Sequence, residues 1–83
     1  MITRPLPKPQ EDVLFFAMRY ALGRRTAAPS IVVGEITRLW NYLRPATQEQ
    51  MRQEIALAVS REKAGDACDV VEWGKVLKLP TIP

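Results

Sequence analysis

The chain has 83 residues, of which 47% are hydrophobic and 25% charged, a composition and length that fit one small globular domain and leave no room for a second. It contains no histidine and one cysteine, which excludes an imidazole base, a histidine metal ligand and an intrachain disulfide. A domain this small buries few apolar residues and cannot also form a deep cleft. We therefore expect a binding protein that is not an enzyme and has no cofactor or metal.

The net charge of +3 is unevenly distributed along the chain. Residues 1–44 carry seven basic and three acidic side chains, a balance of +4, whereas residues 45–83 carry five and six, a balance of −1. A surplus of arginine in one half creates a local field that attracts anions. The alternative is that these arginines lie along solvated helix faces with their stems on apolar surface.

Cysteine content and hydropathy indicate in which cellular compartment the protein resides. Cys68 stands alone, which is typical of proteins from reducing environments. No run approaches the roughly 18 to 20 apolar residues of a membrane span, and the first nine residues contain three prolines where a signal peptide needs an apolar helix. We therefore expect a cytoplasmic protein that does not enter a membrane.

The chain divides into an arm, a helical domain and a tail. Pro5, Pro7 and Pro9 fix the backbone at alternate positions, which predicts an extended proline-rich arm over 1–9, either disordered or packed across the surface. Residues 10–79 are predicted to form one helical domain, and 80–83 a short tail.

The first predicted helix follows the arm and ends at Gly23. Acidic residues occupy its first turn, and glycine suits the position after its last turn. One apolar stripe of this helix has the spacing i, i+3, i+4, i+7, i+8 and consists of Val13, Phe16, Ala17, Tyr20 and Ala21. Because apolar residues occupy almost the whole circumference, we expect this helix to be central, or to bury a second face against a partner chain.

Three further helices are expected. The second begins at Pro29 and ends before Pro45, the third begins with a capping box over 47–50 and ends at Gly65, and the fourth begins after Asp69. Two glycines inside helices, Gly34 and Gly74, predict close backbone approach. No long segment alternates with period two, so the predicted fold is all-α, a compact bundle of about four short helices.

Polar and charged side chains are most closely spaced in the sequence where the first helix ends. Five side chains there form the candidate ligand-binding set: Arg19, Tyr20, Arg24, Arg25 and Thr26. Guanidinium groups bind phosphate in bidentate fashion, and a tyrosine ring stacks on a base or donates its hydroxyl proton. The structural alternative is that Arg19 pairs with Glu49 or Glu54, that Tyr20 is a core residue, and that 23–25 only cap a helix.

Other residues are weaker candidates for a functional site. Trp40 falls on an apolar stripe and is predicted to be core, which leaves only Arg38, Tyr42 and Arg44 for nucleic acid. Cys68 has acidic neighbours that disfavour its thiolate, so it is interpreted as a small packed residue. The acids of 66–72 lack the ligand order of a calcium loop, so no metal site is predicted.

Two stretches resemble small proteins encoded in phage and prophage genomes. They are "FFAMRYALGRRTAAPSIV" and "EQMRQEIALAVSREKAGDACDVVEWGKVLKL", with an R-Y-A-L-G-R-x-T turn and an A-G-x-x-x-D-x-x-x-W ending. The resemblance covers 13–79 and implies a role against bacterial immunity. Those proteins carry an aromatic residue after the turn, whereas this chain has Ala27 and Ala28. Stacking on a ligand would then fall to Tyr20.

Three functions are compatible with these observations. The first is a sponge that sequesters an anionic nucleotide signal of bacterial immunity without altering it. The second is an anti-CRISPR-like inhibitor that covers a surface of a host immune protein. The third is a small nucleic-acid-binding regulator, which the acidic second half of the chain disfavours. The apolar first helix favours a homo-oligomer, most simply a symmetric dimer, and an oligomer is what a sponge needs to enclose its ligand.

Overall fold

Four α-helices and one 3-10 turn make up the fold of the computed structural model, which describes residues 5–22, 29–62 and 70–80. The elements are α1 (Lys8–Leu22), α2 (Pro29–Leu39), η1 (Trp40–Tyr42), α3 (Pro45–Glu62) and α4 (Val70–Leu77). No strand occurs in these three ranges, and the all-α prediction is confirmed. The Cα radius of gyration is 12.3 Å, close to the roughly 12 Å of a compact domain of this length.

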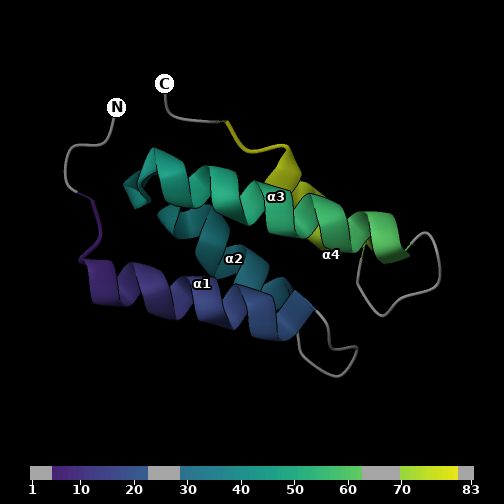
Figure 1. Ribbon diagram of the computed structural model, residues 1–83, viewed down its shortest axis with the longest axis horizontal. Coiled ribbons are helices and arrows are strands. Elements are labelled where there is room, and N and C mark those ends of the chain that lie inside the picture. Colours follow the sequence, from purple (N-terminus) through teal and green to yellow (C-terminus); the bar gives the residue numbers. More distant parts are fainter. Residues whose placement is uncertain (1–4, 23–28, 63–69, 81–83) are drawn as a thin grey trace.

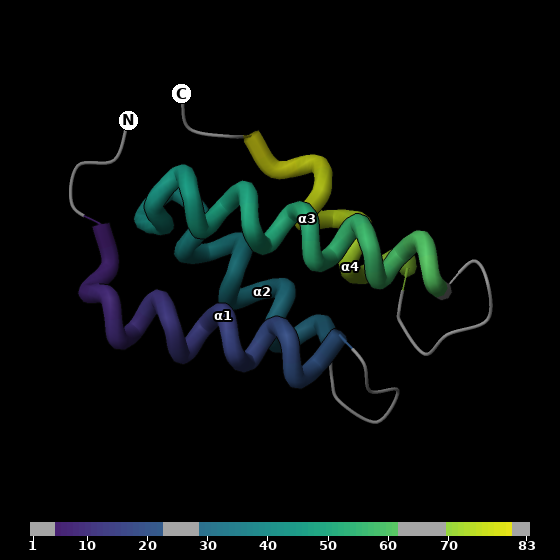
Figure 2. The backbone as a smooth tube through the Cα atoms, in the orientation of Figure 1, coloured from purple at the N-terminus to yellow at the C-terminus, as the bar shows by residue number. Residues whose placement is uncertain are grey.

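The helices cross around one apolar core. In Figure 1, α1 and α3 run in the same direction along the long axis of the molecule, α2 returns diagonally between them, and α4 lies behind α3. The tube in Figure 2 shows the same crossing, with α1 along one edge of the bundle. The buried apolar residues come from all of these elements and include Met18, Ile36, Trp40, Ile55 and Trp73.

The described part of the N-terminal arm packs across the surface. The amide of Leu6 donates to the carbonyl of Tyr42 at 2.9 Å, and the Leu6 side chain packs against the core. Residues 8 and 9, predicted as arm, belong instead to α1. Pro9 is tolerated there because amides of the first helical turn have no intrahelical partner to lose.

The buried face of α1 shares only Ala21 with the stripe noted in the sequence. Leu14, Met18, Ala21 and Leu22 are buried, whereas Val13, Phe16 and Tyr20 are 68%, 65% and 64% exposed. Two apolar stripes compete on this helix, and the one with the longer aliphatic side chains faces α2 and α3. In the single chain α1 thus buries one face and exposes the other, and burial of the second face against a partner chain stays a prediction.

The start of α3 also differs from the prediction. The helix begins at Pro45, so Thr47 lies inside its first turn and is not the N-cap of a capping box. Proline suits the first helical position because its missing N–H would have had no partner there. Gln48 is fully buried and donates from Nε2 to the carbonyl of Trp40 at 2.8 Å. The predicted end of this helix at Gly65 lies outside the described residues.

Side chains from other elements hold the C-terminal end of α4. Trp73 and Val76 face the core. The Arg52 guanidinium on α3 donates to the carbonyl of Leu79 at 2.9 Å and to that of Leu77 at 3.5 Å. The indole N–H of Trp40 donates to the carbonyl of Pro80. The Leu77 carbonyl is the last of α4 and lacks an intrahelical partner, whereas those of Leu79 and Pro80 belong to the segment that follows the helix. The predicted cap at Asp69 lies outside the described residues.

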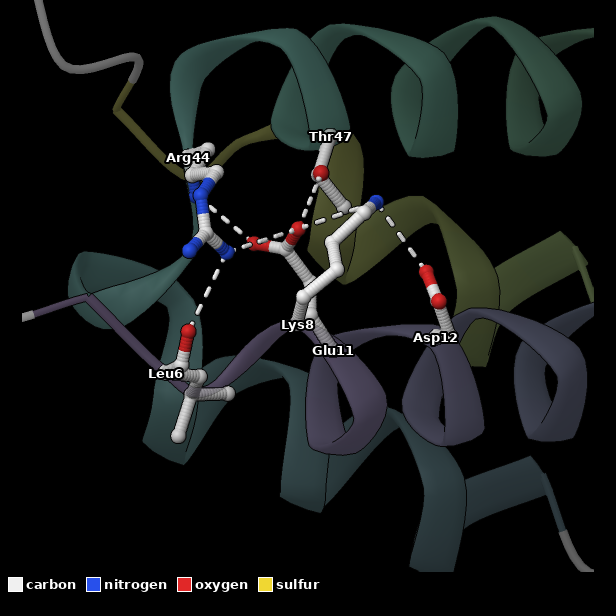
Figure 3. Close-up of polar contacts among 6 residues, drawn as sticks. All are labelled: Leu6, Lys8, Glu11, Asp12, Arg44 and Thr47. Carbon is white, nitrogen blue, oxygen red and sulfur yellow. Dashed lines mark hydrogen bonds and ion pairs between the residues drawn. The ribbon is translucent and has the colours of Figure 1, made fainter.

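A buried carboxylate joins α1 to the start of α3. Glu11 is 1% exposed, and its two oxygens accept from the amide of Arg44 at 2.9 Å and from the hydroxyl of Thr47 at 2.8 Å (Figure 3). Arg44 Nη1 lies 3.2 Å from Glu11 Oε1 and donates to the carbonyl of Leu6 at 3.1 Å. The negative charge thus sits where the dipole of α3 is positive.

These partners keep Glu11 ionised despite its burial. Burial alone would raise the pKa of this carboxyl, but the hydrogen bonds from the Arg44 amide and Thr47, together with the Arg44 charge, outweigh it and hold the pKa below 4.5. The folded state therefore binds a proton at Glu11 less readily than the unfolded chain.

We expect Glu11→Gln to destabilise the fold by about 2 kcal/mol, because the amide cannot satisfy two donors and a guanidinium as the carboxylate does. The measurement is the urea midpoint at neutral pH. The matched control is Glu35→Gln, which breaks an exposed carboxylate–arginine pair on α2 and should cost far less. Equal losses in the two variants would contradict the role assigned to Glu11.

The lowered pKa of Glu11 also predicts how stability depends on pH. Because the unfolded chain takes up the proton first, this stabilisation is complete above pH 4.5 and is lost as the pH falls through the lower pKa of the folded state. Urea unfolding of the wild type and of Glu11→Gln should therefore differ most above pH 4.5 and converge in stronger acid. Parallel pH profiles would show that Glu11 does not titrate as described.

Candidate functional site

The predicted ligand-binding set is only partly within the described residues. Arg19 and Tyr20 lie in the last turn of α1, whereas Arg24, Arg25 and Thr26 lie outside the described residues. The structure thus places two of the five side chains at the C-terminal end of α1 and leaves the positions of the other three as predictions.

Arg19 lies on the surface beside α3. Its side chain is 57% exposed, and its Nε is 3.8 Å from Glu54 Oε1, so one of the two predicted pairings is found. The other predicted partner, Glu49, accepts instead from Gln53 at 3.2 Å. The guanidinium carbon lies 5.9 Å from the ring centroid of Phe15, within cation–π range. A long, exposed ion pair of this kind contributes less than about 1 kcal/mol, so an anionic ligand can compete with it.

Tyr20 is a surface residue. The alternative that placed its ring in the core is wrong, because the residue is 64% exposed. An exposed phenol ring offers a face for stacking and a hydroxyl group for hydrogen bonding. With Arg19 next to it in the chain, the end of α1 presents an aromatic ring and a positive charge to solvent.

An exposed apolar face runs along α1 toward that end. It consists of Val13, Phe16 and Tyr20, which we call the outer face of α1. The sequence alone did not show which stripe of this helix is buried, because the spacing of these residues suits a buried face and an exposed one equally. No helix in the described part of the chain is long and apolar enough to cross a membrane. An apolar face of this kind is typical of a protein interaction surface.

The second candidate surface does not offer unpaired arginines. Arg38 binds Glu35 through two hydrogen bonds of 3.1 and 2.8 Å, and the Arg38 hydrogen bond lowers the pKa of the Glu35 carboxyl. Arg44 is held by Glu11 and by the carbonyl of Leu6. Trp40 is buried as predicted, and Tyr42 is 48% exposed. Two of the three residues proposed for nucleic acid thus have partners within the protein.

The described residues do not form a cluster of side chains that could bind a metal ion. Across 5–22, 29–62 and 70–80, no group of three or more cysteine or acidic side chains comes close enough to hold an ion. Glu72 pairs with Lys75 at 3.2 Å on α4. Cys68, Asp66 and Asp69 lie outside the described residues, and the interpretation of Cys68 as a packed residue stays a prediction.

The chain matches no protein-family model, and comparisons with the curated proteins and with the solved structures gave no match. The likeness to phage proteins therefore stays a prediction, and any assignment of function depends on the residues of α1 and of the turn that follows it.

The Arg19–Glu54 pair gives a test of whether Arg19 contacts an anion. Glu54→Gln removes a negative charge 3.8 Å from Arg19 Nε and should raise affinity for a nucleotide by about threefold at low salt. The urea midpoint should change little, because the pair is exposed. The binding measurement is calorimetry with cyclic dinucleotides, and Glu49→Gln, which removes an exposed charge elsewhere on α3, is the control. A fall in affinity in Glu54→Gln would contradict a role for Arg19.

Proposed function

We propose that the protein is a phage-type anti-defence factor that binds an anionic nucleotide signal of bacterial immunity and holds it chemically unchanged in the cytoplasm of the infected host. The observation that carries the proposal is the exposure of Tyr20 and Arg19, 64% for the residue and 57% for the side chain, at the end of α1. The basic sequence Gly23-Arg24-Arg25-Thr26 follows directly in the chain.

The chemistry of these side chains suits a nucleotide with phosphate groups. Guanidinium groups donate pairs of hydrogen bonds to phosphate oxygens, and each charge-assisted contact contributes about 1.5 to 3 kcal/mol. The Tyr20 ring offers a stacking surface for a base, which contributes about 1 to 3 kcal/mol. Sequestration requires no general base, which agrees with a chain that has no histidine.

Enclosing a ligand requires more surface than one small bundle offers. A homo-oligomer is therefore part of the proposal, since a second copy can cover a ligand held on an exposed helix end. For Arg19 to bind a ligand anion in place of Glu54, only the exposed Arg19–Glu54 ion pair of 3.8 Å has to break.

A second candidate function is favoured by the outer face of α1. Val13 and Phe16 are 68% and 65% exposed and carry no phosphate-binding group. An inhibitor that covers a host immune protein, in the manner of an anti-CRISPR, would use such a face directly. A nucleic-acid-binding regulator is less well supported, because Arg38 and Arg44 are engaged by Glu35 and Glu11.

The proposed function predicts that Arg24→Ala or Arg25→Ala weakens nucleotide binding by roughly ten- to a hundredfold, the loss of one charge-assisted contact. Lysine at either position should restore only part of the affinity, because it keeps the charge without the planar fork. The matched control is Arg61→Ala, which removes an exposed arginine from the last turn of α3.

The measurement is calorimetry with isolated cyclic and ADP-ribose-type nucleotides, followed by chromatography to show that the bound nucleotide is recovered intact. Two results would refute sequestration: no binding by the wild type while inhibition in infected cells is retained, or consumption of the nucleotide by trace amounts of protein. The first of these would favour the protein-contact inhibitor.

A further inference from the structure

We propose that the outer face of α1 packs against the same face of a second copy, with the two helices antiparallel about a two-fold axis beside Phe16. This inference rests on the homo-oligomer of the proposed function and assigns its contact to α1. It places the Tyr20 ring in that contact, so nucleotide binding in the dimer depends on the arginines.

The outer face differs from the other exposed apolar positions. Val13, Phe16 and Tyr20 lie at spacings of three and four residues, so they share one side of a helix. The remaining large exposed apolar residues occur singly on their elements: Ile31 on α2, Tyr42 on η1, Leu57 on α3 and Val71 on α4. Among the described elements, α1 thus presents the one continuous apolar stripe to solvent.

The outer face is suited to pairing with itself. α1 runs from Lys8 to Leu22, so Phe16 stands next to the middle of the helix. Val13 lies three residues before it and Tyr20 four residues after it. A two-fold axis that passes beside Phe16, perpendicular to the helix, therefore brings Val13 of one copy close to Tyr20 of the other. The two helices then lie side by side along nearly their whole length.

Charge favours the antiparallel over the parallel arrangement. Lys8 and Asp12 lie in the first half of α1 and Arg19 in the last turn, with side-chain exposures of 64%, 50% and 57%. Antiparallel pairing brings Asp12 of one copy toward Arg19 of the other, and Lys8 toward the negative end of the other helix dipole. Parallel pairing would place the flank with Lys8, Asp12 and Arg19 on opposite sides of the contact in the two copies, so Asp12 and Arg19 would not meet.

The apolar area fits a reversible dimer. A fully buried aromatic side chain contributes about 150 to 250 Å², and Phe16, Tyr20 and Val13 are each about two-thirds exposed. The three together therefore offer roughly 350 Å² per copy. Because interfaces are about 60% apolar, the whole contact is on the order of 1,100 Å², at the lower limit for specific association. Dissociation in the micromolar range is expected.

Sedimentation equilibrium of the ligand-free protein over a wide concentration range tests the assembly. The wild type should approach the dimer mass, and Phe16→Glu should weaken association by about a hundredfold, because it buries charges at the centre of the contact. The matched control is Val71→Glu on α4, at a position that is 78% exposed; it should leave association within twofold of the wild type. Circular dichroism establishes that each variant is folded.

Disulfide crosslinking tests the direction of the helices. In a Cys68→Ser background, Phe16→Cys should form a covalent dimer under mild oxidation. Val13→Cys and Tyr20→Cys should not, because a rise of 1.5 Å per residue places each about 9 to 12 Å from its own copy, beyond the roughly 7 Å that a disulfide spans. Val71→Cys is the negative control.

Three results would overturn the proposal. A monomer at every concentration would leave the outer face without a second copy and would favour a host protein as its partner. A dimer that persists in Phe16→Glu would place the contact elsewhere. Crosslinking at 13, 16 and 20 alike would indicate parallel helices. A monomer at every concentration would also remove the homo-oligomer from the proposed function, whereas nucleotide binding at Arg24 and Arg25 is measured separately by calorimetry and can fail by itself.

Discussion

The buried carboxylate of Glu11 fixes the rotation of α1 about its own axis. To reach the Arg44 amide and the Thr47 hydroxyl, the side chain must point into the bundle. At 100° per residue, Leu14, Met18 and Leu22 then point inward with it, whereas Val13, Phe16 and Tyr20 lie on the opposite side. One acidic residue thus determines which of two apolar stripes forms the core and which one meets solvent.

This dependence explains why the number and type of elements were predictable and the orientation of α1 was not. Helical periodicity is a local property, and it indicated four helices and no sheet. The partners that hold Glu11 are 33 and 36 residues away in sequence. The same contact misled the prediction for α3, because Thr47 was expected to cap its own helix and instead donates to a carboxylate of α1.

At the candidate site, charge pairing was more predictable than burial. The pairing of Arg19 with Glu54 was one of two expected ion pairs, because both acids lie on the third helix. Whether Tyr20 is buried or exposed could not be predicted, because a tyrosine near a helix end is found in the core and at the surface alike. Close backbone approach at Gly34 and Gly74 does not occur within the chain, because a Cβ atom added at either would meet nothing within 4 Å; approach between two copies stays a prediction.

The contacts at the end of α4 have a consequence for how the molecule opens. α4 has eight residues, fewer than the roughly 12 to 15 that an isolated helix needs to be even marginally stable in water. Its helical state therefore depends on the guanidinium of Arg52 and the indole of Trp40, which belong to α3 and η1. The last helix cannot unfold by itself without releasing those groups, so α4 unfolds together with the part of η1 and α3 that holds it.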